Sequence, residues 1–286
     1  MATRCHPVDG GIATHRRLAT VAGVLILLPP SEGKTAPDEG TPQDPRQLLF
    51  PALADHRRTV ADALVSLCAR PGAAEVLKVG PAVSDEVARN VELLAAPARP
   101  AREVYTGVLF AAAGLDRLTR VQAERAERTV RIFSGLWGVV RPGDPIPAYR
   151  LSMGATLPGV GPLAAAWRPH LAPLLDVAAR GDVVIDCRSA TYVGAWRPRA
   201  GTDWVSVAVL RERDGRRTVV SHHAKHLRGV LVRHLLTRRG KEPRSAAAVL
   251  RAARELVGTS VSGEPVVAVE LETGAHGRST LAIVTS

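Results

Sequence analysis

Short apolar runs alternate with helix-period segments along this chain. The runs "VLILL" (24–28) and "DVVIDC" (182–187) are continuous and bounded by turn residues, which predicts two buried strands. Apolar residues recur at the helical period in four further segments, and the last of these is stopped by Gly181. The pattern therefore predicts helices at about 52–69, 83–94, 119–133 and 170–180.

The second half of the chain predicts an antiparallel sheet extension with helices. Two β-rich runs flank Asp214-Gly215, which is the usual signal of a type I′ hairpin. Helices are predicted at about 224–238 and 245–257, and a closing hairpin joins "PVVAVELE" (265–272) to "STLAIVT" (279–285). These elements predict a mixed α/β (α+β) fold, with one compact domain over 23–286 and a central mixed sheet flanked by helices.

Two stretches are predicted to lack regular structure. "TAPDEGTPQDP" (35–45) is rich in turn residues, and "RPGDPIPAYR" (141–150) has three prolines in ten residues. The basic and apolar segment before residue 29 begins like a signal peptide, but its apolar run is short and no small-x-small cleavage site follows. We expect residues 1–22 to be a poorly ordered extension and the protein to be a cytoplasmic monomer without a membrane segment.

The formal charge of +11 favours an anionic partner, with nucleic acid as the first candidate. The positive charge is almost entirely arginine, since Lys occurs only at 34, 78, 225 and 241, and the chain is rich in Ala, Val, Gly and Pro. A GC-rich genome produces the same bias without selection for binding, so both explanations stay open. Three widely spaced cysteines predict neither disulfides nor a structural zinc site.

The loop "PPSEGKT" (29–35) follows the first predicted strand, where a phosphate-binding loop would lie. A Walker motif requires glycine at position 28, and Leu28 stands there, which argues against a P-loop. Ser31 and Lys34 remain candidates for a hydroxyl and a cation at the carboxyl end of a strand, where open sheets bind ligands. The alternative is an ordinary surface turn.

Three blocks in loop-prone sequence carry a family resemblance. They are Tyr105-Thr106-Gly107, then "SGLWGVVRPGD" (134–144), then "YRLSMG" (149–154). In this order they resemble the YaaA family of peroxide stress proteins, and "LLPPSEGKT", "AAAWRPHL", "VVIDCRSATY" and "SHHAKHLRGVLVRHLL" extend the resemblance over about 24–240. The chain departs from the family pattern at Trp137, where Tyr is usual, and at Asp186-Cys187-Arg188, where the family has Asn-Leu-Ala.

The resemblance implies a compact α/β fold that binds DNA in a basic cleft, with a helix-hairpin-helix-like element, and that limits oxidative damage linked to iron. The residues support a version of this hypothesis, because arginine binds phosphate bidentately. A cationic surface is predicted from Arg141, Arg150, Lys225, Arg228 and Arg233. The alternative is that Arg141 and Arg150 pair with Asp144 and Asp186 inside the fold.

Tyr105, Trp137 and Tyr149 are candidates for stacking on nucleic-acid bases, or else core residues. A different class of function, an enzyme acting on a small anionic nucleotide- or amino-acid-derived molecule, would use the same loops. For this alternative the candidate catalytic residues are Lys34, Tyr105, Asp144, Tyr149 and Lys225. The full predicted cleft comprises Ser31, Lys34, Tyr105, Thr106, Ser134, Gly135, Trp137, Arg141, Tyr149, Arg150, Trp167, Lys225, Arg228 and Arg233.

No cofactor or metal site is predicted. His222 and His226 have the i, i+4 spacing of metal ligands, but the preceding strand is expected to extend to about 223, which would break a shared helix. His223 and His234 complete this cluster, which we interpret as exposed polar residues. Cys187 is interpreted as a buried small hydrophobe rather than a nucleophile, and no ferritin-like Glu-x-x-His pattern is present.

Two short stretches are candidates for a DNA-binding hairpin between helices. "LPGVG" (157–161) matches the motif locally and leads into a helix at Pro162, and the amides of Val160 and Gly161 would be its donors. The segment upstream is too rich in proline for the first helix. "FSGLWG" (133–138) follows a predicted helix and is an equally plausible hairpin.

Overall fold

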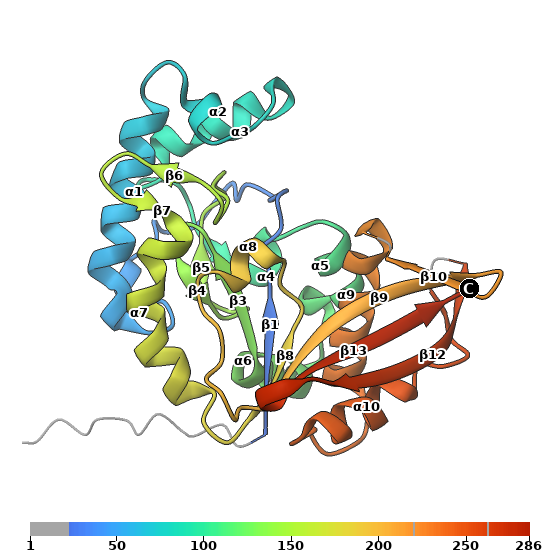
Figure 1. The fold of residues 1–286 in the computed structure, drawn as a ribbon. Coiled ribbons are helices and arrows are strands. Elements are labelled where there is room, and N and C mark those ends of the chain that lie inside the picture. The colour runs from blue at the N-terminus through green and yellow to red at the C-terminus, as the bar shows by residue number, and fades with distance from the viewer. Residues whose placement is uncertain (1–22, 220, 262) are drawn as a thin grey trace, which may run out of the picture.

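A nine-stranded mixed sheet organises the computed structural model, which describes residues 23–219, 221–261 and 263–286 (Figure 1). The strand order is β11–β12–β13–β9–β8–β1–β3–β4, with β10 paired to β9. The strands are β1 (Val24–Leu28), β3 (Val130–Ser134), β4 (Gly138–Val140), β8 (Val183–Asp186), β9 (Trp204–Arg213), β10 (Arg216–Val219), β11 (Ser260–Val261), β12 (Glu264–Thr273) and β13 (Arg278–Thr285). The predicted mixed α/β fold is confirmed. The extension predicted for residues 1–22 lies outside the described residues.

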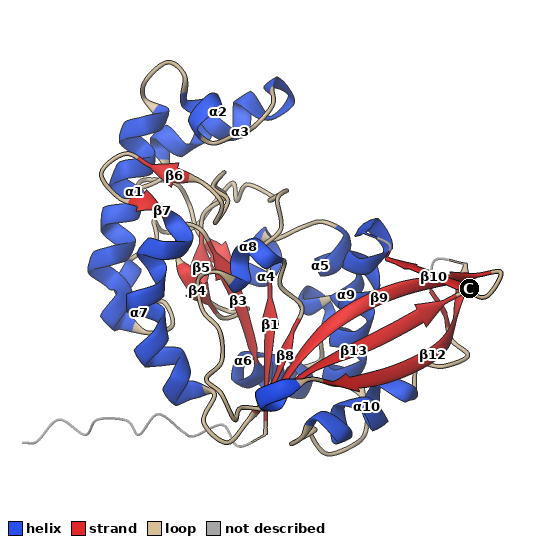
Figure 2. Cartoon of the chain, viewed as in Figure 1, coloured by secondary structure: helices blue, strands red, loops and turns tan. Residues whose placement is uncertain are grey.

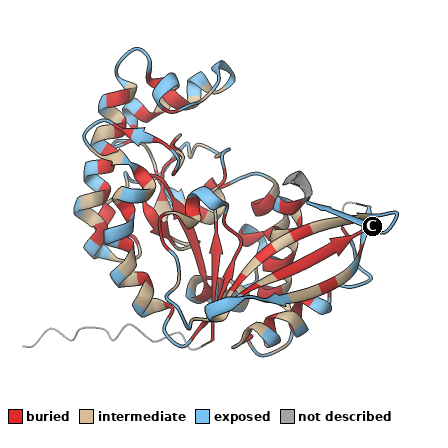
Figure 3. Cartoon of the chain, in the orientation of Figure 1, coloured by how far each residue is buried: buried red, intermediate tan, exposed pale blue. Residues whose placement is uncertain are grey.

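The inner strands β3, β1, β8, β9 and β13 run parallel, and antiparallel strands complete both edges. Strands β1, β3 and β8 are buried at every position, whereas β9 alternates between buried and less buried residues and β12 is buried only at Val266 and Val269 (Figure 3). This difference follows from coverage, because a central parallel strand is packed on both faces and a peripheral strand on one.

Helices surround the sheet (Figure 2). They are α1 (Ala54–Cys68), α2 (Ala73–Val76), α3 (Ser84–Arg89), α4 (Ala101–Val104), α5 (Val108–Ala113), α6 (Arg120–Thr129), α7 (Leu163–Ala178), α8 (Ala190–Val193), α9 (Ser221–Thr237) and α10 (Ala246–Arg254). Helices α6, α9 and α10 contact β1, β9 and β12, and α7 contacts β4 beside α1 (Figure 1). None of the described helices is long and apolar enough to cross a membrane.

The predicted helix at 119–133 is wrong in its last turn. Helix α6 ends at Thr129, and Val130–Ser134 form β3, which is fully buried beside β1. Three of these five residues, Val130, Ile132 and Phe133, are β-branched or aromatic, and they fit a strand packed on both faces better than a helix exposed on one side. The strand matters for the site, because it carries Ser134 to the carboxyl edge of the sheet.

Helix α7 is longer than predicted, and it contains Pro169 and Pro173. Both prolines are exposed, whereas Leu163, Trp167, Leu171 and Leu175 are buried at four-residue intervals. Each proline therefore removes one helical hydrogen bond on the solvent side, and the packed face remains continuous.

The other predicted elements are largely confirmed. The 83–94 segment is α3 followed by a 3₁₀ turn at Asn90–Glu92, and 245–257 contains α10. Asp214 and Gly215 have φ angles of 50° and 71°, as a type I′ turn requires. The proline-rich 141–150 segment is irregular apart from Pro145–Ile146 (β5), which pairs with Arg99–Pro100 (β2).

Candidate functional site

The loop after β1 and the Tyr105-Thr106-Gly107 block lie side by side at the carboxyl edge of the sheet. Lys34 and Tyr105 form an isolated antiparallel bridge, and the Thr35 amide donates to the Val104 carbonyl at 2.9 Å. The Thr106 amide donates to the Gly33 carbonyl at 3.3 Å, and the Thr106 side chain is exposed. Two motifs that are separated by 70 residues in the sequence therefore form one wall of a site.

Gly107 is required by this close approach. Its φ angle is 102°, and a Cβ at this position would lie 2.7 Å from the Ser31 hydroxyl. Any larger residue would both strain the backbone and displace Ser31. The glycine of the Tyr-Thr-Gly block thus allows the two loops to touch.

Three buried hydroxyls form a chain beneath this wall. Ser134 Oγ lies 2.6 Å from Tyr149 Oη, which lies 2.8 Å from Tyr105 Oη. Ser134 Oγ also accepts hydrogen bonds from the amides of Leu136 and Trp137, at 3.2 and 2.9 Å. Since both lone pairs of Ser134 are used, its own hydrogen is donated to Tyr149.

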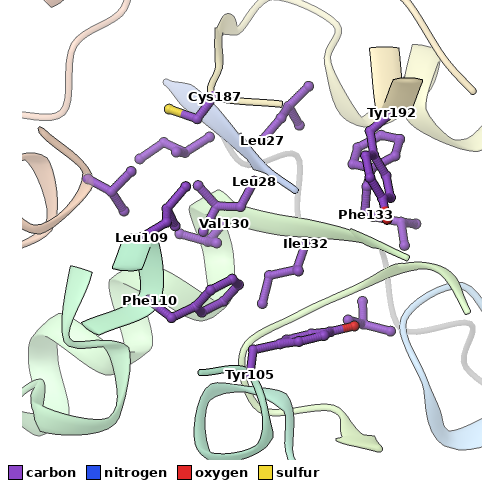
Figure 4. Packing of buried hydrophobic residues seen from close by; sticks show 14 of the residues in the cluster. Leu27, Leu28, Tyr105, Leu109, Phe110, Val130, Ile132, Phe133, Cys187 and Tyr192 are labelled. Carbon is purple, nitrogen blue, oxygen red and sulfur yellow. The ribbon is translucent and has the colours of Figure 1, made fainter. Parts of the chain in front are cut away.

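Burial keeps these phenols protonated. The pKa of Tyr149 is raised well above its ordinary value, chiefly by desolvation and then by the neighbouring Tyr105. Desolvation likewise raises the pKa of Tyr105. Figure 4 shows the Tyr105 ring packed among apolar side chains that include Phe110 and Ile132. In this arrangement the tyrosines are hydrogen-bond donors and acceptors rather than bases.

Lys34 lies over the hydroxyl chain. Its Nζ is 4.3 Å from the centre of the Tyr149 ring and 5.6 Å from that of Tyr105. The same atom donates to the Ser31 carbonyl at 2.9 Å and to the Glu32 carbonyl at 3.4 Å. Desolvation lowers the pKa of Lys34 from 10.5 to about 8, and Arg150 adds to this effect, whereas Glu32 and Glu86 oppose it. An amine with this pKa exchanges protons near neutral pH.

Arg150 completes the site from the side of α3. Its backbone is fixed by Asn90, which is fully buried and hydrogen-bonds both the amide and the carbonyl of Arg150 at 2.9 Å. Its guanidinium forms ion pairs with Glu86 at 3.0 Å and with Glu32 at 3.2 Å. The predicted alternative, in which Arg150 pairs with Asp186, is wrong, because Asp186 is paired with Arg188.

Arg141 and Asp144 lie away from this site. The register of β3 and β4 pairs Ser134 with Gly138 and Ile132 with Val140, so Arg141 follows at the opposite end of the strand pair. Asp144 is buried and accepts hydrogen bonds from the Arg141 guanidinium and from the amides of Arg141 and Leu49. The internal Arg141–Asp144 pairing considered above is therefore found, and Asp144 has a structural set of partners.

The predicted cationic residues of α9 have different environments. Lys225 is exposed, Arg228 donates to the Val207 carbonyl at 2.8 Å, and the Arg233 guanidinium lies 3.5 Å from the Gly114 carbonyl. Gly229, between these residues, allows α9 to cross α5, since a Cβ there would lie 2.3 Å from the Leu109 carbonyl oxygen. These arginines anchor the helix to its neighbours.

The four aromatic residues of the predicted cleft are all core residues. Tyr105, Trp137 and Tyr149 are each 2% exposed, and Trp167 is fully buried with its Nε1 donating to the Gly135 carbonyl at 2.8 Å. No ring of this set presents a face to solvent, as base stacking would require. Gly135 is buried against the Leu151 carbonyl and Ser152 backbone.

Neither candidate hairpin is flanked by two helices. "FSGLWG" is the turn between antiparallel strands β3 and β4, so α6 does not lead directly into it. "LPGVG" joins Thr156–Leu157 (β6) to Gly161–Pro162 (β7), and the Val160 amide donates to the Leu157 carbonyl. The helix expected after Pro162 is present as α7. In the described chain both stretches are β-turns.

The expectation that a strand extends to about 223 is wrong, because β10 ends at Val219 and α9 begins at Ser221. His222 and His226 therefore share a helix, although the side chains of residues 220–223 lie outside the description. The described side chains contain no group of three or more His, Cys, Asp or Glu that could hold a metal ion. Cys187 is fully buried, which raises its thiol pKa to about 12 and agrees with the structural interpretation.

Several residues of interest were missed in the sequence. Glu32 lies within the 29–35 loop, Glu86 and Asn90 lie in the predicted helical segment 83–94, and Lys78 lies in the turn after α2. No sequence motif marks any of them. A basic groove of about 790 Å³ was also missed. It is bordered by five cationic residues, Arg125, Arg238, Lys241, Arg244 and Arg251, together with Glu242 and the start of α10.

Comparison with known proteins identifies the family of the chain. A family model described as "Peroxide stress protein YaaA" matches residues 24–252. The chain belongs to the YaaA family of peroxide stress proteins. A UPF0246 protein of Streptomyces coelicolor is 45% identical over 235 residues, covering 82% of this chain and 90% of the relative. A UPF0246 protein of Corynebacterium efficiens is 40% identical over 217 residues, covering 75% and 85%. The family resemblance in the Tyr105 to Gly154 blocks is thus confirmed.

Proposed function

We propose that the carboxyl-edge site of this YaaA-family protein binds a small anionic molecule and that Lys34 exchanges a proton with it. One observation carries this proposal. The Lys34 amine is partly buried against Tyr149, beside the Arg150 guanidinium, on loops that the resemblance to the family had already singled out.

The chemistry follows from the pKa values. Near pH 8 about half of the Lys34 side chains are neutral, so the amine accepts a proton from an acidic group of the substrate and returns it later. Tyr149 and Tyr105 stay protonated, and the hydroxyl chain fixes the rings on which the amine rests. Arg150 supplies the positive charge that attracts an anion and disfavours protonation of Lys34.

Competitive acetylation tests the proposal. The chain has four lysines, at 34, 78, 225 and 241, and mass spectrometry distinguishes their peptides. We expect the acetylation rate of Lys34 to rise with a midpoint near pH 8, below the midpoint of the exposed Lys225 and Lys241 in the same samples. A Lys34 midpoint equal to that of the exposed lysines would contradict the proposal.

DNA binding is the second candidate function, and the basic groove supports it. Lys241, Arg244 and Arg251 are exposed, and they border the same hollow with Arg125 and Arg238. Glu242 and Glu255 neutralise part of this charge through Arg125, Arg128 and Arg238. The exposed cations are suited to backbone phosphates without sequence preference. This groove is a different surface from the cleft predicted in the sequence.

Salt-dependent binding of a short DNA duplex tests this candidate. We expect binding to weaken steeply with salt, and Lys241→Gln with Arg244→Gln to reduce the slope of log K against log salt by about 2. Arg46→Gln with Arg120→Gln is the matched control, because it also removes two exposed cations and neither lines the groove. An equal loss in the control, or binding that is indifferent to salt, would argue against a specific role for the groove.

The family's name connects it with peroxide stress, and we propose that this chain contributes to protection from peroxide- and iron-dependent damage. A strain lacking the chain should then be more sensitive to hydrogen peroxide. Complementation by the wild type but not by Lys34→Met would assign protection to the carboxyl-edge site. Complementation by Lys34→Met but not by the groove variant would assign it to DNA binding.

A further inference from the structure

A small pocket lies between the turn after α2 and the segment that follows Arg150. Its volume is about 290 Å³. The apolar and backbone parts of its lining come from Leu77, Val79, Leu151, Gly154 and Ala155, and four polar side chains complete it: Glu32, Lys78, Arg150 and Ser152. The pocket therefore presents two cations, one hydroxyl and one carboxylate.

Glu32 and Arg150 connect the pocket to the Lys34 amine. The Glu32 carbonyl accepts from Lys34 Nζ, and its carboxylate lies 3.2 Å from Arg150. Arg150 is close enough to Lys34 to lower the pKa of the amine. A molecule held on Arg150 would consequently lie beside the group that we propose exchanges protons.

Arg150 has a fixed backbone and two unequal carboxylate partners. The buried amide of Asn90 holds the main chain on both sides, so the guanidinium is the part that is free to adjust. The Glu86 side chain is 30% exposed and belongs to α3, whereas the Glu32 side chain is 56% exposed and belongs to a loop. The Glu32 member of this pair is largely exposed, and ion pairs exposed to water contribute little to stability.

Lys78 borders the opposite side of the pocket. Its φ angle of 55° is in the left-handed region, which is uncommon for a residue other than glycine. Its amide donates to the Glu75 carbonyl at 3.1 Å, so the turn is closed in this conformation. Within the described part of the chain its ammonium has no ion-pair partner, although it lines a pocket together with Arg150.

We propose that this pocket is an oxyanion subsite, in which the carboxylate or phosphate of a small molecule replaces Glu32 on Arg150 and is also bound by Lys78 and Ser152. Arg150 binds such a group bidentately, and Lys78 adds a second positive charge. Glu32 occupies this position on Arg150 and is displaced when a stronger anion binds. The inference rests on the proposed function of Lys34, because it names the class of molecule that this amine meets.

The size of the pocket limits the ligand. A volume of about 290 Å³ is at the lower end of the range for small-molecule sites. It suits a compact acid or phosphate ester and excludes a nucleic-acid duplex. Nucleic acid is therefore expected only at the basic groove on the other surface.

Calorimetric titration of the full chain with inorganic phosphate and with succinate tests the subsite. Glu32→Gln should bind the preferred anion about fivefold more tightly than the wild type, because the competing carboxylate is gone. Lys78→Gln should bind about fivefold more weakly, and Arg150→Gln at least tenfold more weakly. Preference for phosphate or for succinate identifies which oxyanion the site takes.

Matched controls distinguish the effect of charges in the pocket on anion affinity from the effect of the protein's net charge. Glu124→Gln and Arg120→Gln remove one charge each from an exposed i, i+4 pair on α6, and neither should change anion affinity. If Arg150→Gln does not fold, Arg150→Lys replaces it in the anion titration, because lysine keeps the positive charge but cannot bind an oxyanion bidentately. Unchanged affinity in Glu32→Gln, equal effects in the controls, or binding of a short oligonucleotide alone would overturn the inference.

Lys34 acetylation in the same variants distinguishes this inference from the proposed function. Because Glu32 raises the pKa of Lys34, the midpoint should fall in Glu32→Gln and rise when phosphate is bound. A midpoint near 8 with no effect of Glu32 on anion affinity would reject the subsite and leave the amine chemistry in place. An ordinary midpoint would reject the amine chemistry even if phosphate binds.

Discussion

Lys34 Nζ lies 4.3 Å from the centre of the buried Tyr149 ring, so a cation and an uncharged aromatic surface face each other at the edge of the sheet. Attraction between a cation and a ring partly compensates the amine for lost water. The pKa of about 8 indicates that the compensation is incomplete, since desolvation is the largest effect on the amine. The lowered pKa of Lys34 therefore makes the free energy of unfolding depend on pH.

The first prediction concerns that pH dependence. The pKa of Lys34 is about 8 in the folded protein and 10.5 as its ordinary value, so between these pH values the unfolded chain binds more protons. Stability therefore rises with pH in this window. From pH 7 to pH 9.5 the wild type should gain about 1–2 kcal/mol relative to Lys34→Met.

Urea unfolding at the two pH values measures this difference. The tyrosines and cysteines also titrate towards alkaline pH, but they are common to both proteins and cancel in the comparison. Lys225→Met, at an exposed position, should follow the wild type. If Lys34→Met showed the same pH dependence as the wild type, the amine would not be perturbed.

The second prediction concerns the hydroxyl chain. Ser134→Ala removes the acceptor of two buried amides and a partner of Tyr149, which should lower the free energy of unfolding by about 2–4 kcal/mol. Tyr105→Phe removes one hydrogen bond at the end of the chain and should cost about 1 kcal/mol. Urea unfolding gives both values, and an equal effect of the two substitutions would contradict the order of the chain.

The fold was predicted well where the sequence pattern is local. Continuous apolar runs marked β1 and β8, and Asp214-Gly215 marked a hairpin, because each depends on a few neighbouring residues. The end of α6 was missed since Val130 to Ser134 continue an apolar period that suits either a helix or a strand. The segment forms a strand because it pairs with β1, which lies about a hundred residues earlier in the chain.

The candidate site was predicted in part for a similar reason. The position of Ser31 and Lys34 after a predicted strand, and of Tyr105 and Tyr149 in the family blocks, made them candidates, and the structure groups them around the Lys34 amine. Arg141 was a candidate as a cationic residue of the second family block, but a β-hairpin places it at the other end of the strand pair. Glu86 and Asn90 reach Arg150 from a distant helix and a 3₁₀ turn, and no local pattern indicates such a contact.

The third prediction tests the glycine of the β3–β4 turn. Gly138 has a φ angle of 71°, and a Cβ there would lie 2.6 Å from the fully buried Trp167 ring. Gly138→Ala should cost about 3–5 kcal/mol, because backbone strain adds to a clash that the packed core cannot relieve. Gly159→Ala is the matched control, since its φ angle is 76° and no atom lies within 4 Å of the added Cβ.

The control should cost about 1–2 kcal/mol from backbone strain alone. Thermal or urea unfolding of the two variants separates the two contributions. Similar losses in both would mean that Trp167 moves freely and that the turn does not depend on it. Near-ultraviolet circular dichroism of the tryptophans then reports whether the ring has shifted.

The fourth prediction concerns two stacked histidines between α1 and α7. The rings of His56 and His170 are 4.0 Å apart with an interplanar angle of 19°, and His56 also meets the edge of Trp167 at 4.6 Å. In the described chain, His56 Nε2 is buried without a hydrogen-bond partner. Desolvation, with a smaller effect of His170, lowers the pKa of His56 to about 4.

The sign of the pH effect follows from this lowered pKa. Between pH 6.5 and 4 the unfolded chain binds a proton at His56 that the folded protein does not, so stability falls as the solution is acidified. From pH 7 to pH 5 we expect a loss of about 1 kcal/mol, after allowance for partial exposure of the ring. His56→Phe keeps the aromatic packing against Trp167 and should abolish this loss, whereas His226→Gln on α9 should retain it. Urea unfolding of the three proteins at both pH values measures the effect, and an undiminished loss in His56→Phe would assign the acid sensitivity to other groups.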